Sequence, residues 1–392
     1  MQPTLSAFPL YLIVKKIIFR RFYFMSIPKF DPSELKVIAE IPNRFGYQPI
    51  PIYNFPVTGK EAIKALFERK PIWQVMLNMG VEAAPFTPPI HPDYVARALV
   101  IDGTFVPGVT NTTGGKDLFG IEWEYVPSAR GSMVRPGKPF IEDANELKDK
   151  VIWPDIAKWD WTGCQKANET YLNKTNAIHG MLLNGWFERL IAFMDFEGAV
   201  LAISDEDQQD AVKEFFDKLT NLYIEICDKQ LKHFPQIDYF VIHDDWGSQK
   251  DTFFSPATVR EMIVPYMRRL TDFLHFKGRY CDLHSCGNLI KQVPNMIEAG
   301  FDSWNPQLMN DIGKIYELYG DKIIIATAPD DLFDPETASE EEQRASAKAY
   351  AEKYCNPNKP TTFSQYAQAD LKIMTTAFRE ELYKQSRLLY GV

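Results

Sequence analysis

The sequence predicts an α/β fold in which parallel strands close into a (β/α)8 barrel of the TIM type. Beyond residue 175, short apolar segments alternate with helical stretches, which is typical of a parallel sheet with crossover helices. The last four strand-like segments are evenly spaced and end in polar residues, which favours a closed barrel over an open sheet. No GxGxxG motif follows a strand, so the sequence does not support a dinucleotide-binding domain.

The barrel elements are expected in regular order along the second half of the chain. The expected strands are 177–184, 239–243, 279–284, 302–305 and 323–328. The helices expected to alternate with them are 207–232, 257–275, 289–299 and 337–354, with one further short helix between the last two strands. Two more segments are candidate strands, an early buried run at 71–76 and a weaker run at 361–366, which is the only candidate for an eighth strand.

The N-terminal part is expected to cover the barrel. Residues 25–175 are rich in Pro and Gly and contain turn clusters, so they are interpreted as loops, short helices and the first barrel elements, with 176–392 as the rest of the same domain. Residues 1–24 are expected to be a non-native or disordered extension. A secretory signal is not expected, because the apolar run 8–14 precedes the basic residues, which is the reverse of the order in a signal. A working chain that begins at Met25 is favoured over a membrane-surface anchor.

Composition excludes several classes of protein. The formal net charge is −9 and the basic residues are scattered, so a nucleic-acid partner is not expected. The five cysteines form no short repeated framework of the kind found in secreted domains, which favours a cytoplasmic location. No stretch is long and apolar enough to predict a transmembrane segment.

Polar side chains follow four of the predicted strands, where barrel enzymes carry their active sites. They are, in chain order, Asp244 and Asp245, His284 and Cys286, Asn305 and Gln307, and Asp330 and Asp331. Because the carboxyl ends of parallel strands meet at one rim, these side chains are expected to face a common site.

His284 and Cys286 form the most informative pair. Residues i and i+2 at an extended strand end point to the same face, so both ligand atoms can reach one metal. Imidazole and thiolate together favour zinc, and a second thiolate as third ligand would complete a site with one open position; Cys355 is the best candidate for it. From spacing alone, a packed cysteine beside a hydrogen-bonded histidine is the alternative.

The remaining candidates each have a functional and a structural interpretation. Asp244 and Asp245 are candidate catalytic residues that handle or orient a proton, and the alternative is that such an aspartate caps a helix. His243 lies within the strand and is either a ligand or a core residue. Trp246 and Trp304 are candidates for an aromatic substrate-binding mouth, and their alternative is plain core packing.

Several segments resemble the C-terminal half of the uroporphyrinogen decarboxylase (URO-D) superfamily. They are 243–249, 265–270, the turn at 277–278, 283–288 and 300–306. Within that superfamily, the His-x-Cys-Gly motif resembles the zinc-dependent methylcobalamin:coenzyme M methyltransferases and their relatives in corrinoid-dependent demethylation. The resemblance implies a URO-D type barrel with zinc held by His284, Cys286 and a second cysteine about seventy residues on, which maps onto Cys355. The early arginine motif of the decarboxylases is missing from 71–80, so porphyrin decarboxylation is not expected.

The resemblance therefore implies a zinc-dependent methyltransferase. It would move a methyl group between a small methylated substrate or thiol and a corrinoid, with Trp246, Asn305, Gln307 and Trp304 as substrate-binding candidates. The chain has no Asp-x-His-x-x-Gly type motif, so a separate corrinoid protein is the expected partner. A decarboxylase-like lyase that uses strand-end carboxylates and a non-catalytic corrinoid- or small-ligand-binding barrel are the alternatives, and a homodimer is compatible with all three.

Overall fold

The protein is described by a computed structural model. The structure describes residues 27–41, 50–78, 81–97, 99–104, 114–127, 131–367 and 372–392. The predicted extension at 1–24 lies outside these ranges. No helix in the described ranges is long and apolar enough to span a membrane.

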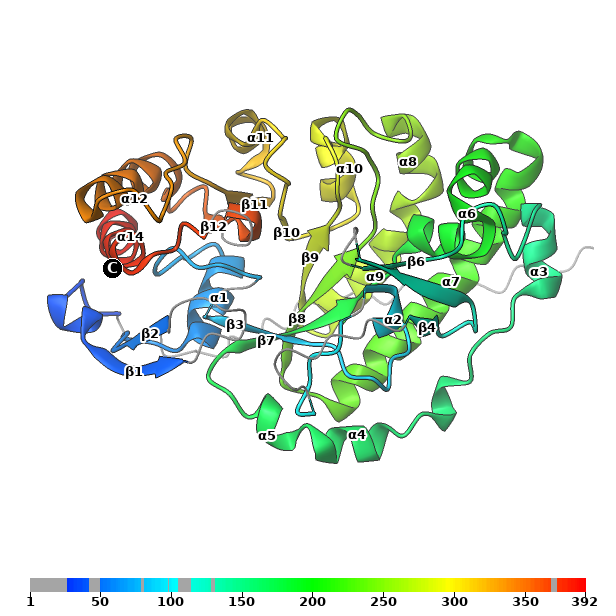
Figure 1. Cartoon of the computed structure of the whole chain (residues 1–392), viewed down its shortest axis with the longest axis horizontal. Coiled ribbons are helices and arrows are strands. Elements are labelled where there is room, and N and C mark those ends of the chain that lie inside the picture. The colour runs from blue at the N-terminus through cyan, green and yellow to red at the C-terminus, as the bar shows by residue number, and fades with distance from the viewer. Residues whose placement is uncertain are drawn as a thin grey trace, which may run out of the picture.

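A curled sheet of seven parallel strands forms the centre of the molecule (Figure 1). Its strands, in spatial order, are β12 (Thr361–Phe363), β11 (Ile324–Thr327), β10 (Ser303–Trp304), β9 (Tyr280–His284), β8 (Ile237–His243), β7 (Ala177–Leu182) and β3 (Ala83–Phe86). Neighbouring strands in the list pair in parallel throughout. All five strands expected between 177 and 328 are present, and 361–366 contains β12, so the predicted TIM-like barrel is confirmed.

The early candidate strand at 71–76 lies against β12, although it has no strand assignment. The backbone N–H of Phe363 donates to the carbonyl oxygen of Val75 (2.9 Å), and the N–H of Leu77 donates to Oγ1 of Thr362 (3.2 Å). Ala83 at the start of β3 packs in one cluster with Trp73, Val75 and Leu77. The segment therefore lies between the two edge strands of the sheet.

Helices cover the outer face of the sheet. In chain order they are α6 (Trp186–Ser204), α7 (Glu206–His233), α8 (Pro256–Met262), α9 (Val264–Phe276), α10 (Val293–Glu298), α11 (Ile312–Tyr319), α12 (Glu340–Tyr354) and α14 (Thr376–Tyr390). The main hydrophobic core lies between these helices and the outward-facing side chains of the strands. α1 (Gly59–Phe67) instead packs against inward-facing side chains, where Phe67 stacks on Tyr280. The single helix expected at 257–275 is two helices, because Pro265 at the start of α9 has no N–H to continue the preceding hydrogen-bond ladder.

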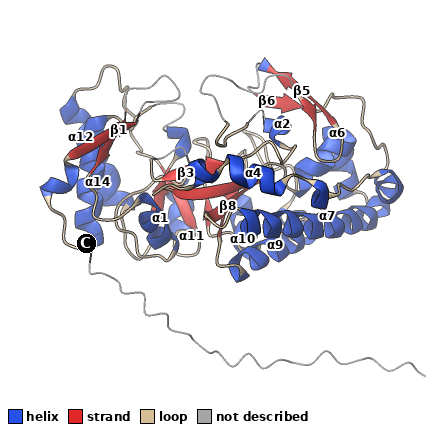
Figure 2. Cartoon of the chain, turned by 90° about the horizontal axis from the view of Figure 1, so that it is seen from below, coloured by secondary structure: helices blue, strands red, loops and turns tan. Residues whose placement is uncertain are grey.

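The N-terminal part contributes short elements around the barrel (Figure 2). They are β1 (Val37–Ile41), β2 (Ile50–Tyr53), α2 (Tyr94–Arg97), β4 (Gly115–Lys116), β5 (Glu122–Val126), β6 (Gly131–Met133), α3 (Leu147–Lys150), α4 (Trp161–Ala167) and α5 (Glu169–Leu172). β1 and β2 pair antiparallel, and β4, β5 and β6 form a separate antiparallel sheet. A fully buried ion cluster ties this region to the barrel, because Arg189 of α6 pairs with Asp93 and Asp117.

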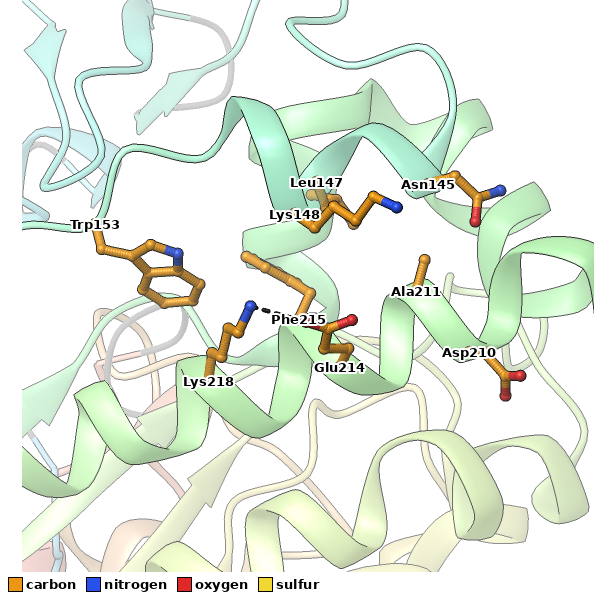
Figure 3. Close-up of a pocket in the computed structure, with 9 residues that line it drawn as sticks. All are labelled: Asn145, Leu147, Lys148, Trp153, Asp210, Ala211, Glu214, Phe215 and Lys218. Atoms are coloured by element: carbon orange, nitrogen blue, oxygen red, sulfur yellow. Dashed lines mark hydrogen bonds and ion pairs between the residues drawn. The ribbon is translucent and has the colours of Figure 1, made fainter.

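A surface pocket of about 200 Å³ lies between α3 and α7 (Figure 3). Trp153 and Phe215 provide its aromatic walls, and Lys218 pairs with Glu214 at its edge. None of the residues predicted for the active site lines it, so it is separate from the strand ends.

Candidate functional site

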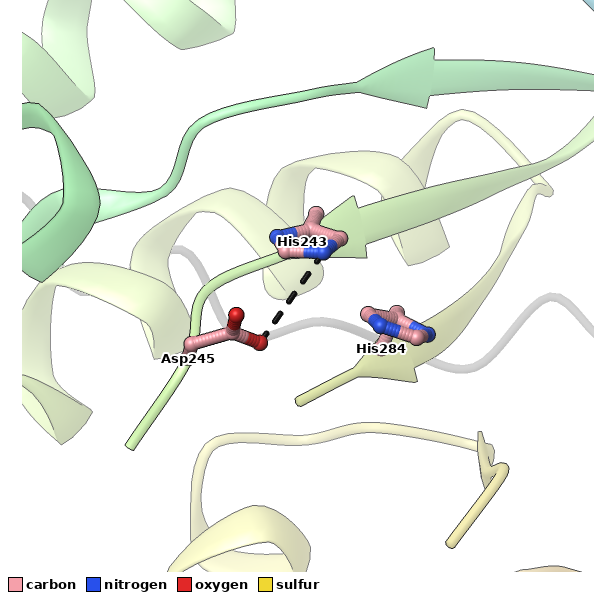
Figure 4. Close-up of side chains that lie close together, drawn as sticks. All are labelled: His243, Asp245 and His284. Atoms are coloured by element: carbon pink, nitrogen blue, oxygen red, sulfur yellow. Dashed lines mark ion pairs between the residues drawn. The ribbon is translucent and has the colours of Figure 1, made fainter. Parts of the chain in front are cut away.

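The ends of β8 and β9 bring two histidines together. The two strands pair in register so that His243 lies opposite His284, two residues beyond the pair Val241 and Asp282. Because side chains alternate along a strand, the two histidines emerge on the same face. Their rings stack with centroids 4.3 Å apart and an interplanar angle of 23°. Figure 4 shows both rings at the tips of the adjacent strands, with Asp245 beside them.

The residues that follow these strands add a carboxylate and a thiol. The backbone N–H of Cys286 donates to Oδ1 of Asp245 (2.7 Å), which fixes the carboxylate between the two loops. Sγ of Cys286 lies 3.5 Å from Nε2 of His284, and Oδ1 of Asp245 lies 3.9 Å from Nε2 of His243. The structure thus brings His284 and Cys286 together as the sequence predicts.

Glu188, in the first turn of α6, holds His243 from behind. Its Oε2 lies 2.7 Å from Nδ1 of His243, and both side chains are largely buried. A carboxylate on Nδ1 favours the tautomer whose proton is on that nitrogen, so Nε2 presents its lone pair toward Asp245. Glu188 was not predicted from the sequence, because it is 55 residues from His243 and no local pattern links the two.

Asp244 has a structural environment. Its carboxylate accepts hydrogen bonds from the backbone N–H groups of Phe187 (3.3 Å) and Glu188 (2.9 Å) and from Nε1 of Trp246 (3.0 Å). The residue at the N-cap of α6 is Gly185, which has no side chain. Asp244, which follows β8, caps this helix in its place. Burial raises the pKa of Asp244 to about 7, with a further contribution from Glu188. Of the two predicted carboxylates, Asp245 is the one that lies beside the histidines.

The end of β12 contributes from the opposite side. The hydroxyl of Tyr366 lies 3.3 Å from both ring nitrogens of His284, and Nε2 of Gln365 lies 3.5 Å from Nδ1. Neither residue was identified from the sequence, although both lie at the end of the weakest predicted strand. The rule that barrel sites form at strand ends would have indicated them.

Beneath the histidines, the barrel interior contains a buried polar cluster. Asp282 accepts hydrogen bonds from Oγ of Ser303 (2.5 Å) and from Nδ2 of Asn78 (2.9 Å), and burial raises its pKa to about 6. His179 on β7 stacks on Tyr239, and neither of its ring nitrogens has a hydrogen-bond partner among the described residues. Burial lowers the pKa of His179 to about 3, so this imidazole is neutral in the folded protein.

The structure does not bring Cys355 to His284 and Cys286. Cys355 ends α12, which runs from the carboxyl end of β11 to the start of β12. In a parallel barrel that position lies at the opposite end of the strands from the rim. The Cys355 thiol donates to Oε1 of Gln74 (3.5 Å) among buried tyrosines, and burial raises its pKa to about 12.

The predicted substrate-binding residues are divided between core and rim. Trp246 and Trp304 are fully buried in the main core. Ser303 points into the barrel toward Asp282, so its neighbour Trp304 points outward to the helices. Gln307 accepts a hydrogen bond from the N–H of Gly287 (2.8 Å) and so supports the loop that carries Cys286. Oδ1 of Asn305 is buried and has no hydrogen-bond partner among the described residues.

The donor atoms present fit a zinc ion. His243, Asp245 and His284 each offer one ligand atom, and these three atoms lie within 4.8 Å of one another. With Zn–N and Zn–S bonds of about 2.0 and 2.3 Å, the edges of a tetrahedral site measure about 3.3–3.6 Å. The separation of 3.5 Å between Cys286 Sγ and His284 Nε2 matches such an edge. Imidazole, carboxylate and thiolate donors together are typical of zinc rather than of magnesium or calcium.

Comparison with known proteins agrees with this fold. A family model described as uroporphyrinogen decarboxylase (URO-D) matches residues 200–353, a range that includes both histidines and Cys286 and ends before Cys355. Among solved structures, a methyltransferase from Methanosarcina mazei is similar at 16% identity and a TM-score of 0.53, over 86% of this chain and 100% of that one. The comparison with curated proteins gives no match.

Two further structures superpose less well. They are an endo-beta-1,4-mannanase from Thermotoga petrophila (8% identity, TM-score 0.30, 64% of this chain and 69% of that one) and a D-psicose 3-epimerase (11% identity, TM-score 0.29, 64% and 88%). Neither superposes well enough to bear on the fold. The family match and the sheet agree: residues 200–353 are similar to the uroporphyrinogen decarboxylase (URO-D) family model and lie within a TIM-like barrel.

Proposed function

We propose that this protein is a zinc-dependent methyltransferase that works with a corrinoid protein. The observation that carries the proposal is the pair His284 and Cys286, with ligand atoms 3.5 Å apart at the rim of a URO-D type barrel. The similar structure from Methanosarcina mazei is that of a methyltransferase, which is consistent with this activity.

The proposed substrates are a small methylated compound or a thiol on one side and a corrinoid on the other. When bound, zinc would supply a site that holds a thiol as its thiolate near neutral pH or polarises the oxygen of a methyl ether. The corrinoid is supplied by the partner protein in this proposal, and the rim of the barrel is where the two proteins would meet.

The residues around the pair have positioning roles. Glu188 orients His243 through Nδ1, and the N–H of Cys286 orients the carboxylate of Asp245. Tyr366 lies within hydrogen-bonding distance of His284 and can donate a proton or a hydrogen bond at the same face. Asp244 fixes the start of α6, and through it the position of Glu188.

The test combines metal analysis with a methyl-transfer assay. Wild-type protein is expected to contain close to one zinc per chain and to change the absorption spectrum of methylcobalamin when a thiol acceptor is added. His284→Ala and Cys286→Ala are expected to lose both properties, whereas Cys164→Ala, on α4 in the N-terminal region, should keep both. Folding of each variant is checked by circular dichroism.

The opposite result would point to a different enzyme. If folded wild-type protein binds no zinc and shows no methyl transfer, the proposal is refuted. Decarboxylation that depends on Asp245 and survives Cys286→Ala would then support the lyase alternative, because a carboxylate at a strand end can act without the metal.

A further inference from the structure

We propose that the metal centre is completed by His243 and Asp245 from the end of β8, and not by a second cysteine. Together with His284 and Cys286 this gives two imidazoles, one carboxylate and one thiolate. The inference rests on the proposed function only in taking zinc as the metal. It replaces Cys355, which the resemblance implied, with residues that the structure places beside the pair.

The first support for this ligand set is the short distance between the donor atoms. The ligand atoms of His243, Asp245 and His284 lie within 4.8 Å of one another, and the separation between His243 Nε2 and Asp245 Oδ1 is 3.9 Å. A tetrahedral zinc site requires edges of about 3.3–3.6 Å, so this pair must close by about 0.3–0.6 Å; the thiol of Cys286 lies beside His284 but outside this group of three, so it must move toward His243 and Asp245 as well. The first of these movements is within the reach of small side-chain rotations. Figure 4 shows the three side chains close together at the strand tips.

Second, hydrogen-bond partners hold the proposed ligands in place. Histidine ligands of metals almost always donate their other ring N–H to a carboxylate or carbonyl, which fixes the ring and raises its basicity. Glu188 provides that partner at 2.7 Å from Nδ1 of His243, and it comes from α6 rather than from the strands. Asp245 is held in a similar way by the N–H of Cys286. This arrangement is the one expected for ligands rather than for residues that only pack.

Third, the change of ligand keeps the net charge of the centre the same. Two thiolates and one neutral imidazole neutralise the two positive charges of zinc. One thiolate from Cys286 and one carboxylate from Asp245 do the same, so the change of ligand leaves the net charge of the centre at zero. A substrate would then bind as an additional ligand, because catalytic zinc can expand to five-coordination.

Fourth, Cys355 lies at the opposite end of the barrel from the pair. It ends α12 at the base of the barrel, where it bonds to Gln74 and packs in a cluster with Tyr350 and Tyr354. To reach the rim it would have to leave this cluster and the helix end, along with the hydrogen bond from its N–H to the carbonyl of Ala351 (2.8 Å).

X-ray absorption spectroscopy of the zinc-loaded wild-type protein tests the ligand set without any substitution. The expected result is a first shell with one sulfur at about 2.3 Å and three nitrogen or oxygen atoms at about 2.0–2.2 Å. A shell with two sulfurs would overturn the inference.

Zinc affinity of single variants, measured by competition with a chromophoric chelator, identifies the ligands. Glu188→Gln is expected to weaken binding by roughly 10–100-fold, as outer partners of metal ligands do. His243→Ala and Asp245→Asn should weaken it by more than Glu188→Gln does. The controls Cys355→Ala, His233→Ala and Asp251→Asn change the same residue types elsewhere and should bind zinc like the wild type. If His243→Ala and Asp245→Asn retain wild-type affinity, or if Cys355→Ala loses it, the inference is wrong.

These results separate the inference from the proposed function. Zinc held by one sulfur but without any methyl transfer would refute the function and keep the metal centre. Methyl transfer by a protein with two sulfur ligands would keep the function and refute this ligand set.

Discussion

Gly287→Ala tests whether the loop behind Cys286 must approach the β8 loop as closely as the structure shows. Gly287 has φ +105°, and an added Cβ would lie 2.5–2.8 Å from the backbone of Gly247. Gly278 is the matched control, since its φ is +69° and an added Cβ would meet nothing within 4 Å. Both substitutions place a side chain at positive φ, which costs an L-residue about 1–2 kcal/mol in the left-handed region of Gly278 and at least as much at Gly287.

Only Gly287→Ala adds a steric overlap with backbone atoms. An ordinary contact begins at 3.4 Å, so the two loops must separate by about 0.6–0.9 Å, and overpacking of this kind costs about 1–3 kcal/mol. Gly287→Ala is therefore expected to lower the free energy of unfolding by about 1–3 kcal/mol more than Gly278→Ala, and to weaken zinc binding by displacing Cys286. Urea denaturation followed by circular dichroism, with zinc analysis, measures both. Equal losses in the two variants, with zinc unchanged, would refute the close approach.

Three other predictions concern stability. Arg189→Met should lower the free energy of unfolding by about 3–5 kcal/mol, because it leaves two fully buried carboxylates without their cation. Arg135→Met removes an exposed ion pair and should lower it by less than about 1 kcal/mol in the same urea titration. Burial lowers the pKa of His179 from 6.5 to about 3 in the folded protein, so below pH 6.5 the unfolded state binds a proton that the folded state does not. The free energy of unfolding should therefore fall by about 1.4 kcal/mol per pH unit as the pH drops below 6.5. His179→Leu should make urea unfolding measurably less pH-dependent between pH 6.5 and 4, and an unchanged slope would contradict the buried neutral imidazole. Asp195 has φ 54° and ψ −176°, a backbone conformation suited to glycine. Asp195→Ala should therefore be less stable than Asp195→Gly by about 1–3 kcal/mol. The reverse order of stability in thermal melts would refute the strained backbone.

The strands were predictable because their signal is local. Short apolar runs that end in polar residues indicated β7 to β11 within a few residues of their observed ends. The helix α6 was not predicted. Its sequence is mostly apolar and includes exposed Phe196 and Leu201, so its apolar residues do not mark one buried face with a 3.6-residue pattern. The segment at 71–76 was predicted as a strand, but it makes its contacts with β12, almost 290 residues away, through side chains as well as backbone.

The site was predictable only in part, for a similar reason. His284 and Cys286 are two residues apart on one strand, so geometry alone places them together. The partners of these residues come from other elements: Glu188 from α6 and Tyr366 from the end of β12. Cys355 shows the opposite case, where an appropriate residue type lies at the wrong end of the barrel because the helix before it runs back to the base. Chain direction, rather than residue type, decides which side chains reach the rim.

The first turn of α6 links the irregular N-terminal region to the histidines. The N–H of Phe187 and of Glu188 bind Asp244, the side chain of Glu188 holds His243, and the side chain of Arg189 pairs with two aspartates of the N-terminal region. Three consecutive residues thus fix the helix to the strand end, to the site and to the covering loops. Any displacement of the covering region that disturbs the buried Arg189 cluster must also move the carboxylate behind His243. Substitutions in this cluster should therefore change the proposed metal site as well as stability, even though none of its members contacts that site directly.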